Sequence, residues 1–141
     1  MDLDQALTLL RADKRGVLVT QRRDGRPQLS NILYVIDEAG MVRISITADR
    51  AKAKNMVRTP QASLYRSRDD FWAYVVIDAD VELTPVAADV NDATVEELVV
   101  HYRAMQGEHD DWDAFRASMV ADHRLIARLS PTHAYGMWPD S

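Results

Sequence analysis

The chain has 141 residues, a length typical of one domain that buries about two-thirds of its unfolded surface, and we expect a single domain over residues 1–141. Its 17 lysines and arginines and 22 aspartates and glutamates give a net charge of −5, which argues against nucleic-acid partners because a binding face for phosphates is positive. The sequence contains no cysteine, which excludes disulfides, thiolate metal ligands and a cysteine nucleophile.

The first third of the chain predicts one short helix followed by three antiparallel strands. Charges are spread through the N-terminal segment, and no apolar run approaches the roughly 20 residues of a membrane span, so we expect a cytoplasmic protein without a membrane partner. Helical spacing of apolar residues gives way to β-branched and alternating segments, and an Asp24-Gly25 turn separates the first two strands. The expected helix is 3–13, and the expected strands are 16–20, 28–36 and 41–47.

Polar residues interrupt two of these strands. Ser30 and Asn31 break the second strand, and Ser45 and Thr47 lie on the polar face of the third. If the two strands pair as a hairpin through the turn at 37–40, these side chains form one polar strip.

The stretch SITADRAKAKN, residues 45–55, turns from a strand pattern into a helix pattern and carries Arg50, Lys52 and Lys54. We expect Asp49 to cap a helix that begins near Arg50 and stops before Pro60. Cations in the first turn of a helix are unfavourable by about 0.3–1 kcal/mol each. An anion at the helix start would explain them, so we predict a phosphate-bearing ligand. The alternative is a solvated basic helix face.

The second half of the chain predicts two more strands, two helices and a closing hairpin. The strands are 62–65 and 71–84, the latter with Phe71 on its core face and with Trp72 and Tyr74 on the other face. Thr94 and Glu97 have the spacing of a capping box for a helix that ends near residue 105, and a short helix follows around 112–120. Residues 125–129 and 134–138 complete a hairpin. We therefore expect a mainly β fold with peripheral helices, its antiparallel sheet closed into a small β-barrel.

Known catalytic motifs are absent from the sequence, which has no G-x-S-x-G, H-E-x-x-H, phosphate-binding P-loop or G-x-G-x-x-G pattern. His109 with Asp110 and Asp111 is more typical of a solvated loop than of a metal site, and Asp78 with Asp80 is more typical of an exposed strand end than of an acid and base pair. We name no catalytic residue and no metal ligand.

Three motifs in order resemble the flavin/deazaflavin oxidoreductase superfamily, whose relatives include pyridoxamine 5′-phosphate oxidase. They are GRPQLSN at 25–31, SITADRAKAKN at 45–55, and Trp72 after a charged turn. The resemblance covers nearly the whole chain. The form R-x-K-x-x-N, followed by a short helix and Pro60, is most similar to the branch that uses the deazaflavin coenzyme F420, as opposed to the branches that use FMN or heme.

The resemblance implies a split β-barrel that forms a homodimer with two cofactor sites at the interface. Arg50 and Lys52 would then hold the cofactor phosphate, with the hydroxyl residues Ser45 and Thr47 on the adjoining strand. The neighbouring strand would place Gln28, Ser30 and Asn31 near the ring system. Trp72 would come from the other subunit. Lys54 and Asn55 stay open, since Lys52 and Lys54 lie about 200° apart on a regular helix.

The function implied is an F420-dependent oxidoreductase that passes a hydride from reduced F420 to a conjugated small molecule such as an enone, a quinone or a tetrapyrrole. The cofactor carries the reactivity in such an enzyme, which accounts for the lack of a catalytic dyad. A proton could come from solvent, Tyr34 or Tyr74. The alternatives are an FMN-dependent enzyme of the pyridoxamine phosphate oxidase type and a non-catalytic protein that binds or carries F420.

Overall fold

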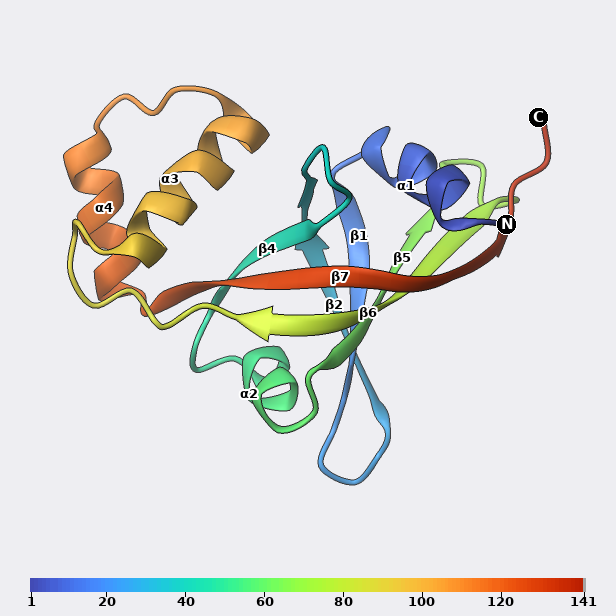
Figure 1. Cartoon of the computed structure of the whole chain (residues 1–141), viewed down its shortest axis with the longest axis horizontal. Coiled ribbons are helices and arrows are strands. Elements are labelled where there is room, and N and C mark those ends of the chain that lie inside the picture. Colours follow the sequence, from blue (N-terminus) through green and yellow to red (C-terminus); the bar gives the residue numbers. More distant parts are fainter. Residues whose placement is uncertain (141) are drawn as a thin grey trace.

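Seven antiparallel strands form one curled sheet, with four helices around it, in residues 1–140, the part of the chain that the computed structural model describes (Figure 1). The strands are β1 (Arg15–Gln21), β2 (Pro27–Leu33), β3 (Val35–Ile36), β4 (Val42–Thr47), β5 (Gln61–Ser67), β6 (Tyr74–Leu83) and β7 (Arg124–Met137). The helices are α1 (Leu3–Arg11), α2 (Ala51–Arg58), α3 (Ala93–Gln106) and α4 (Trp112–Ala121). The prediction of a mainly β fold with peripheral helices is confirmed. None of the helices described is both long and apolar enough to span a membrane.

The sheet curls into a barrel that stays open along one side. Its strand order is β2-β1-β5-β6-β7-β4-β3, so β2 and β3 lie at opposite edges although only Tyr34 separates them in the chain. One residue spans at most about 3.6 Å, and the two edges must therefore meet at Tyr34. The prediction that residues 28–36 pair with β4 as one long strand was wrong, because only the short β3 pairs with β4.

The main core fills the concave side of the sheet. Val42, Ile44 and Ile46 of β4 are almost fully buried there, as the strict alternation of that strand predicts. The helices α1 and α2, which lie at opposite ends of the curled sheet in Figure 1, each contribute a short apolar stripe to the same core. These stripes are Ala6 and Leu10 of α1, and Ala53 and Met56 of α2.

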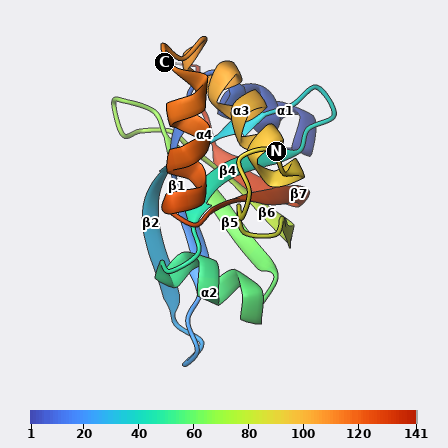
Figure 2. The same ribbon diagram turned by 90° about the vertical axis from the view of Figure 1, so that its left-hand side faces the viewer.

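A second, smaller core lies on the outer side of β7, under the hairpin of α3 and α4 (Figure 2). Leu125, Ala127 and Leu129 point into the barrel, whereas Ile126 between them is fully buried against α3 and α4. Since successive side chains of a strand face opposite sides, β7 forms a wall shared by the two cores. The backbone of β4 pairs with the same part of β7 and sets Ser45 opposite Ile126, so the polar face of β4 lies on this outer side.

The last segment of the chain differs from the predicted closing hairpin. Residues 124–137 form the single strand β7, which pairs with β4 at its start and with β6 along most of its length. Ser130, Pro131 and Thr132 have the composition of a turn, but the register shifts there, with Asp78 opposite His133 and Ala79 opposite Pro131. A β-bulge tolerates proline because one residue of the bulge is left unpaired.

Two further predictions about the second half were wrong. The Asp92 carboxylate caps α3 by accepting a hydrogen bond from the Val95 N–H, and the Thr94 hydroxyl instead donates to a loop carbonyl. Phe71, expected on the core face of a strand, lies in the loop before β6 with a positive φ of 70° and is exposed.

Tyr34 ties the point where the sheet edges meet to α1. Its side chain is 1% exposed, and its hydroxyl donates a hydrogen bond to the Leu10 carbonyl at the end of α1. Burial raises the pKa of this phenol. The Tyr34 hydroxyl is thus engaged inside the protein, and its candidacy as a proton donor was wrong.

Replacing Tyr34 by Phe should lower the free energy of unfolding by about 1 kcal/mol, because the hydrogen bond to the Leu10 carbonyl is lost while the ring still fills its site. Urea unfolding followed by circular dichroism measures the change. Val100→Ala is the control, since Val100 is exposed on α3, and it should change stability by less than about 0.5 kcal/mol. Equal effects of the two variants would contradict the assigned role of Tyr34.

Candidate functional site

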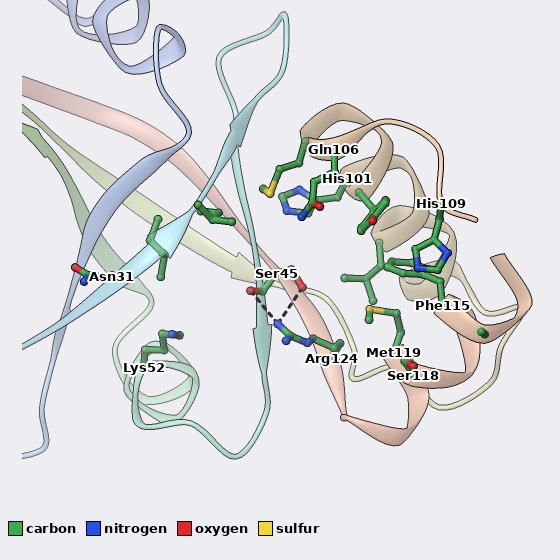
Figure 3. A pocket seen from close by; sticks show the side chains of 16 residues that line it. Asn31, Ser45, Lys52, His101, Gln106, His109, Phe115, Ser118, Met119 and Arg124 are labelled. Atoms are coloured by element: carbon green, nitrogen blue, oxygen red, sulfur yellow. Dashed lines mark hydrogen bonds between the residues drawn. The ribbon is translucent and has the colours of Figure 1, made fainter. Parts of the chain in front are cut away.

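A cavity of about 540 Å³ lies between the open side of the barrel and the α3–α4 hairpin (Figure 3). Its walls come from β2, β4, the first turn of α2, the start of β7 and the inner sides of α3 and α4. The volume is in the range of small-molecule and cofactor sites. The cavity has a cationic end, formed by Lys52 and Arg124, and an apolar end, formed by the two helices.

The cationic end brings together residues from three elements. Arg124, at the start of β7, has one guanidinium nitrogen 3.4 Å from the Ser45 hydroxyl oxygen and 3.4 Å from the Ser45 carbonyl oxygen. Its Nε is buried without a hydrogen-bond partner. Lys52 points into the same space from α2 (Figure 3). Burial lowers the pKa of its ammonium group, and the positive charges of Arg50 and Arg124 lower it further.

The start of α2 adds unpaired backbone donors to these cations. Arg50 occupies the N-cap position with no side-chain hydrogen bond to the helix, and the first turn contains no acidic residue. The prediction that Asp49 caps this helix was therefore wrong. A hydrogen bond from Thr47 is the main cause that lowers the pKa of Asp49. The free N–H groups and the cations make a site suited to an anion such as a phosphate.

The apolar end is built from α3 and α4. Tyr102, His109, Trp112 and Phe115 form a cluster of mutual ring contacts with centroids 5.0–5.8 Å apart. His101 lies beside this cluster, is 6% exposed, and has a buried Nδ1 without a hydrogen-bond partner. Burial is the main cause that lowers the pKa of His101 to about 4, so the imidazole is neutral at pH 7.

Glu97 of α3 fixes the helix hairpin to the sheet. Its carboxylate accepts hydrogen bonds from Arg43 of β4, at 3.1 Å, and from Arg128 of β7. The hydrogen bond from Arg128 is the main cause that lowers the pKa of Glu97. His101 follows Glu97 by four residues and so lies on the same face of α3, which places it over the cavity.

The structure brings some of the predicted site residues together and separates others. Asn31, Ser45 and Lys52 line the cavity, whereas the predicted hairpin strip does not form because β2 pairs with β1 only. Thr47 and Arg50 lie near the cationic end without lining the cavity, and Gln28 and Ser30 lie along β2. Trp72 is in a loop and is 74% exposed.

The two residues left open, Lys54 and Asn55, are also located. Lys54 is exposed on α2. Asn55 is buried, where its amide donates to the Thr20 hydroxyl at 3.2 Å and its carbonyl oxygen accepts from Arg58 at 2.7 Å. Asn55 therefore connects α2 to β1 and Arg58, away from the cavity.

Arg124 and His101 are the functional candidates that sequence reasoning missed. Arg124 reaches Ser45 only because the antiparallel register of β4 and β7 sets Thr47 opposite Arg124. His101 lies one helical turn after Glu97, a signal that carries meaning only once the arginine partners of Glu97 are known. Local patterns around either residue predict nothing of this kind.

Comparison with known proteins identifies the family and the fold. The family described as pyridoxamine 5′-phosphate oxidase matches residues 3–137. A conserved hypothetical protein from Mycobacterium tuberculosis has a similar structure, with a TM-score of 0.74 and 19% identity over 96% of this chain and 84% of that chain. A protein named F420 reductase has a TM-score of 0.67 and 23% identity over 91% of this chain and 94% of that chain. A heme storage protein from Vibrio cholerae has a TM-score of 0.67 and 18% identity over 96% of this chain and 94% of that chain. The split β-barrel fold is confirmed.

The buried His101 predicts a pH-dependent stability. Its pKa falls from 6.5 to about 4 on folding, so the unfolded chain binds this proton more tightly. The contribution of His101 to the free energy of unfolding is therefore fully present above about pH 6.5, and it declines by about 3 kcal/mol as the pH falls to about 4. Urea unfolding between pH 7 and pH 4 measures the slope.

Because carboxylates also titrate in this range, the test is the difference between variants. His101→Phe should show a shallower decline than the unmodified protein, whereas His133→Phe, at an exposed position, should keep the original profile. Identical profiles for all three proteins would contradict the assignment.

Proposed function

The chain belongs to the pyridoxamine 5′-phosphate oxidase family, and from this premise we propose that it is an F420-dependent reductase that acts on a conjugated small molecule. The observation that carries the proposal is the cationic end of the cavity, where Arg124 and Lys52 line the wall beside a helix that begins without a side-chain cap. The R-x-K-x-x-N form of residues 50–55 and the similarity to a protein named F420 reductase support F420 over FMN and heme.

The residues of the cationic end fit a phosphate group. Burial, and to a smaller extent the positive charges of Arg50 and Arg124, lower the pKa of Lys52. A phosphate would offer oxygens to Lys52, to the Arg124 guanidinium group and to the N–H groups of α2. Arg50, Ser45 and Thr47 would complete this set. Arg124 thereby joins the residues proposed from the motif.

The hydride would come from the deazaflavin ring of bound, reduced F420. The protein's part is to hold and orient the ring and to exclude water. Asn31, Ile32 and Leu33 run along the open side of the barrel and line both the cavity described above and a second pocket on its other side. We assign the ring to this edge, with Gln28 and Ser30 further along β2.

A homodimer is part of the proposal, because the outer face of the sheet carries apolar side chains that no helix covers. Leu29, Leu33, Tyr135 and Met137 are exposed there, and an exposed apolar face of this kind is typical of an interaction surface. The strand register aligns this face in rows, one of which runs Asn31, Val17, Tyr65, Val76 and Tyr135. A second subunit on this face would border the open side of the barrel and could bring its Trp72 to the site.

Replacing Arg50 or Lys52 by Ala should raise the dissociation constant of F420 about 10- to 100-fold, because each loses a charged hydrogen bond of about 1.5–3 kcal/mol. Fluorescence titration measures the affinity. Lys54→Ala is the matched control and should bind F420 normally, since Lys54 is exposed two residues along the same helix. Tight binding of FMN with no measurable affinity for F420 would refute the cofactor assignment, and binding without turnover would favour a carrier.

A charge on the outer sheet face should break the dimer. Leu29→Asp is expected to shift the molar mass in light scattering from two chains to one and to weaken F420 binding, because the site would lose its second subunit. Val100→Asp introduces the same charge at an exposed valine of α3 and should leave a dimer. An unmodified protein that is monomeric and binds F420 normally would contradict the interface site.

A further inference from the structure

The charges of the chain are divided between the two sides of the cavity. Residues 89–122, which include α3 and α4, contain nine aspartates and glutamates but two arginines. On the other side lie α2 and the turn between β1 and β2, and residues 22–26 and 49–58 contain seven lysines and arginines but two aspartates. Figures 1 and 2 both show α2 and this turn at the lower end of the molecule and α3 and α4 at the upper end.

Two further acids lie near the basic side without cancelling its charge. Asp78 and Asp80 border the same groove as Gly25 and Pro27. Asp78 accepts a hydrogen bond from the Ser63 hydroxyl at 2.6 Å. With both aspartates counted, the cations of the turn and α2 still outnumber the acids around them. The cavity therefore lies in an electric field that draws an anion towards α2 and away from the helix hairpin.

The turn between β1 and β2 does not need its arginine side chains in order to form. The Arg22 N–H donates to the Arg26 carbonyl at 2.8 Å, and the Gly25 N–H donates to the Arg22 carbonyl at 2.9 Å. The Asp24 carboxylate accepts from the Arg26 N–H at 3.0 Å. These bonds use backbone groups and one aspartate, so three arginines in five residues call for another explanation.

The guanidinium groups of this turn are exposed, and their charge is largely uncompensated. Arg22 lies 3.4 Å from Asp24, but both side chains are about half exposed, and an ion pair of this kind contributes little. Arg23 and Arg26 are exposed and form no ion pair with any of residues 1–140. We call Arg22, Arg23 and Arg26 the turn arginines.

The turn arginines are close to the cationic end of the cavity without being part of it. Arg58 donates to the Gln21 carbonyl at 3.1 Å and so joins the turn to the end of α2. Lys52 lies six residues earlier, about 9 Å along the helix axis. None of the turn arginines is among the residues that line the cavity. Since the Debye length is about 10 Å at 0.1 M salt, their charge acts on an anion that approaches Lys52.

We propose that the turn arginines form a capture surface, which speeds the association of a phosphate-bearing ligand with the cavity and, with the acidic helix hairpin opposite, directs its phosphate towards Lys52. The attraction acts before contact, so it raises the association rate constant and leaves the dissociation rate constant nearly unchanged. This inference rests on the proposed function, because the captured ligand is the cofactor. The net charge of −5 would otherwise repel that ligand.

Stopped-flow fluorescence of F420 mixed with the full-length protein measures both rate constants. Salt shortens the Debye length from about 10 Å at 0.1 M to about 3 Å at 1 M, so the association rate constant should fall about tenfold over this range. Salt screens Lys52 and Arg124 as well, and substitutions at Arg23 therefore provide the specific test.

A series of charges at residue 23 separates attraction from contact. At 0.1 M salt the association rate constant should be unchanged in Arg23→Lys, about twofold lower in Arg23→Gln and about fivefold lower in Arg23→Glu. The dissociation rate constant should stay within about twofold in all three. Arg11→Glu is the matched control and should change neither constant, since Arg11 is exposed on α1, at the opposite end of the curled sheet from α2 (Figure 1).

Three results would overturn the inference while the proposed function stands. They are an unchanged association rate constant for F420 in Arg23→Glu, an equal loss in Arg11→Glu, and an effect confined to the dissociation rate constant, which would mean that Arg23 holds the bound ligand.

FMN and riboflavin, which share a ring system but differ by a phosphate, separate the two proposals. If F420 does not bind but FMN does, the cofactor assignment fails. The capture surface then stands if the association rate constant of FMN follows the charge at residue 23 while that of riboflavin does not. If no phosphate-bearing ligand binds, both proposals fail.

Discussion

The ion pairs of Glu97 with Arg43 and Arg128 are the constraint on which the candidate site depends. They join one helix to two neighbouring strands at the point where the outer face of the sheet would otherwise be bare. The carboxylate is partly buried, so removing either arginine charge would leave another poorly solvated. Because these ion pairs hold α3 against the sheet, they set the distance between the apolar and cationic ends of the cavity.

The site departs from the rules that the rest of the chain obeys. In the barrel interior, apolar side chains alternate and polar groups such as Asn55 have partners. Around the cavity, α2 begins without a side-chain cap, and Arg50, Lys52 and Arg124 lie close enough to affect one another. The buried Arg124 Nε and His101 Nδ1 have no hydrogen-bond partner. Such local conflicts are expected where a structure is shaped for a ligand instead of for its own stability. The fold tolerates them because two separate cores surround the site.

Sequence patterns predicted the features that depend on neighbours along the chain. The alternation of β4, the Asp24-Gly25 turn and the cations of residues 50–54 are local, and the structure has them where expected. Features that depend on pairing were beyond reach. The bulge at Pro131 resembles a turn, the break at Tyr34 sends a continuous pattern to two edges, and Arg124 meets Ser45 only through the register of β4 and β7. Where two polar residues compete for one cap, as Asp92 and Thr94 do, composition does not choose between them.

The placement of the helix hairpin in the chain has an evolutionary consequence. The segment that contains α3 and α4 connects β6 to β7, and these strands are paired from Leu83 and Ala127 onwards. If that segment were replaced by a tight turn, the barrel could keep its register. Since the entropy of closing a loop grows only slowly with its length, relatives could lengthen, shorten or exchange this connection at small cost to the barrel. The shape of the cavity could then diverge among relatives independently of the cations and helix start that we propose as the phosphate site.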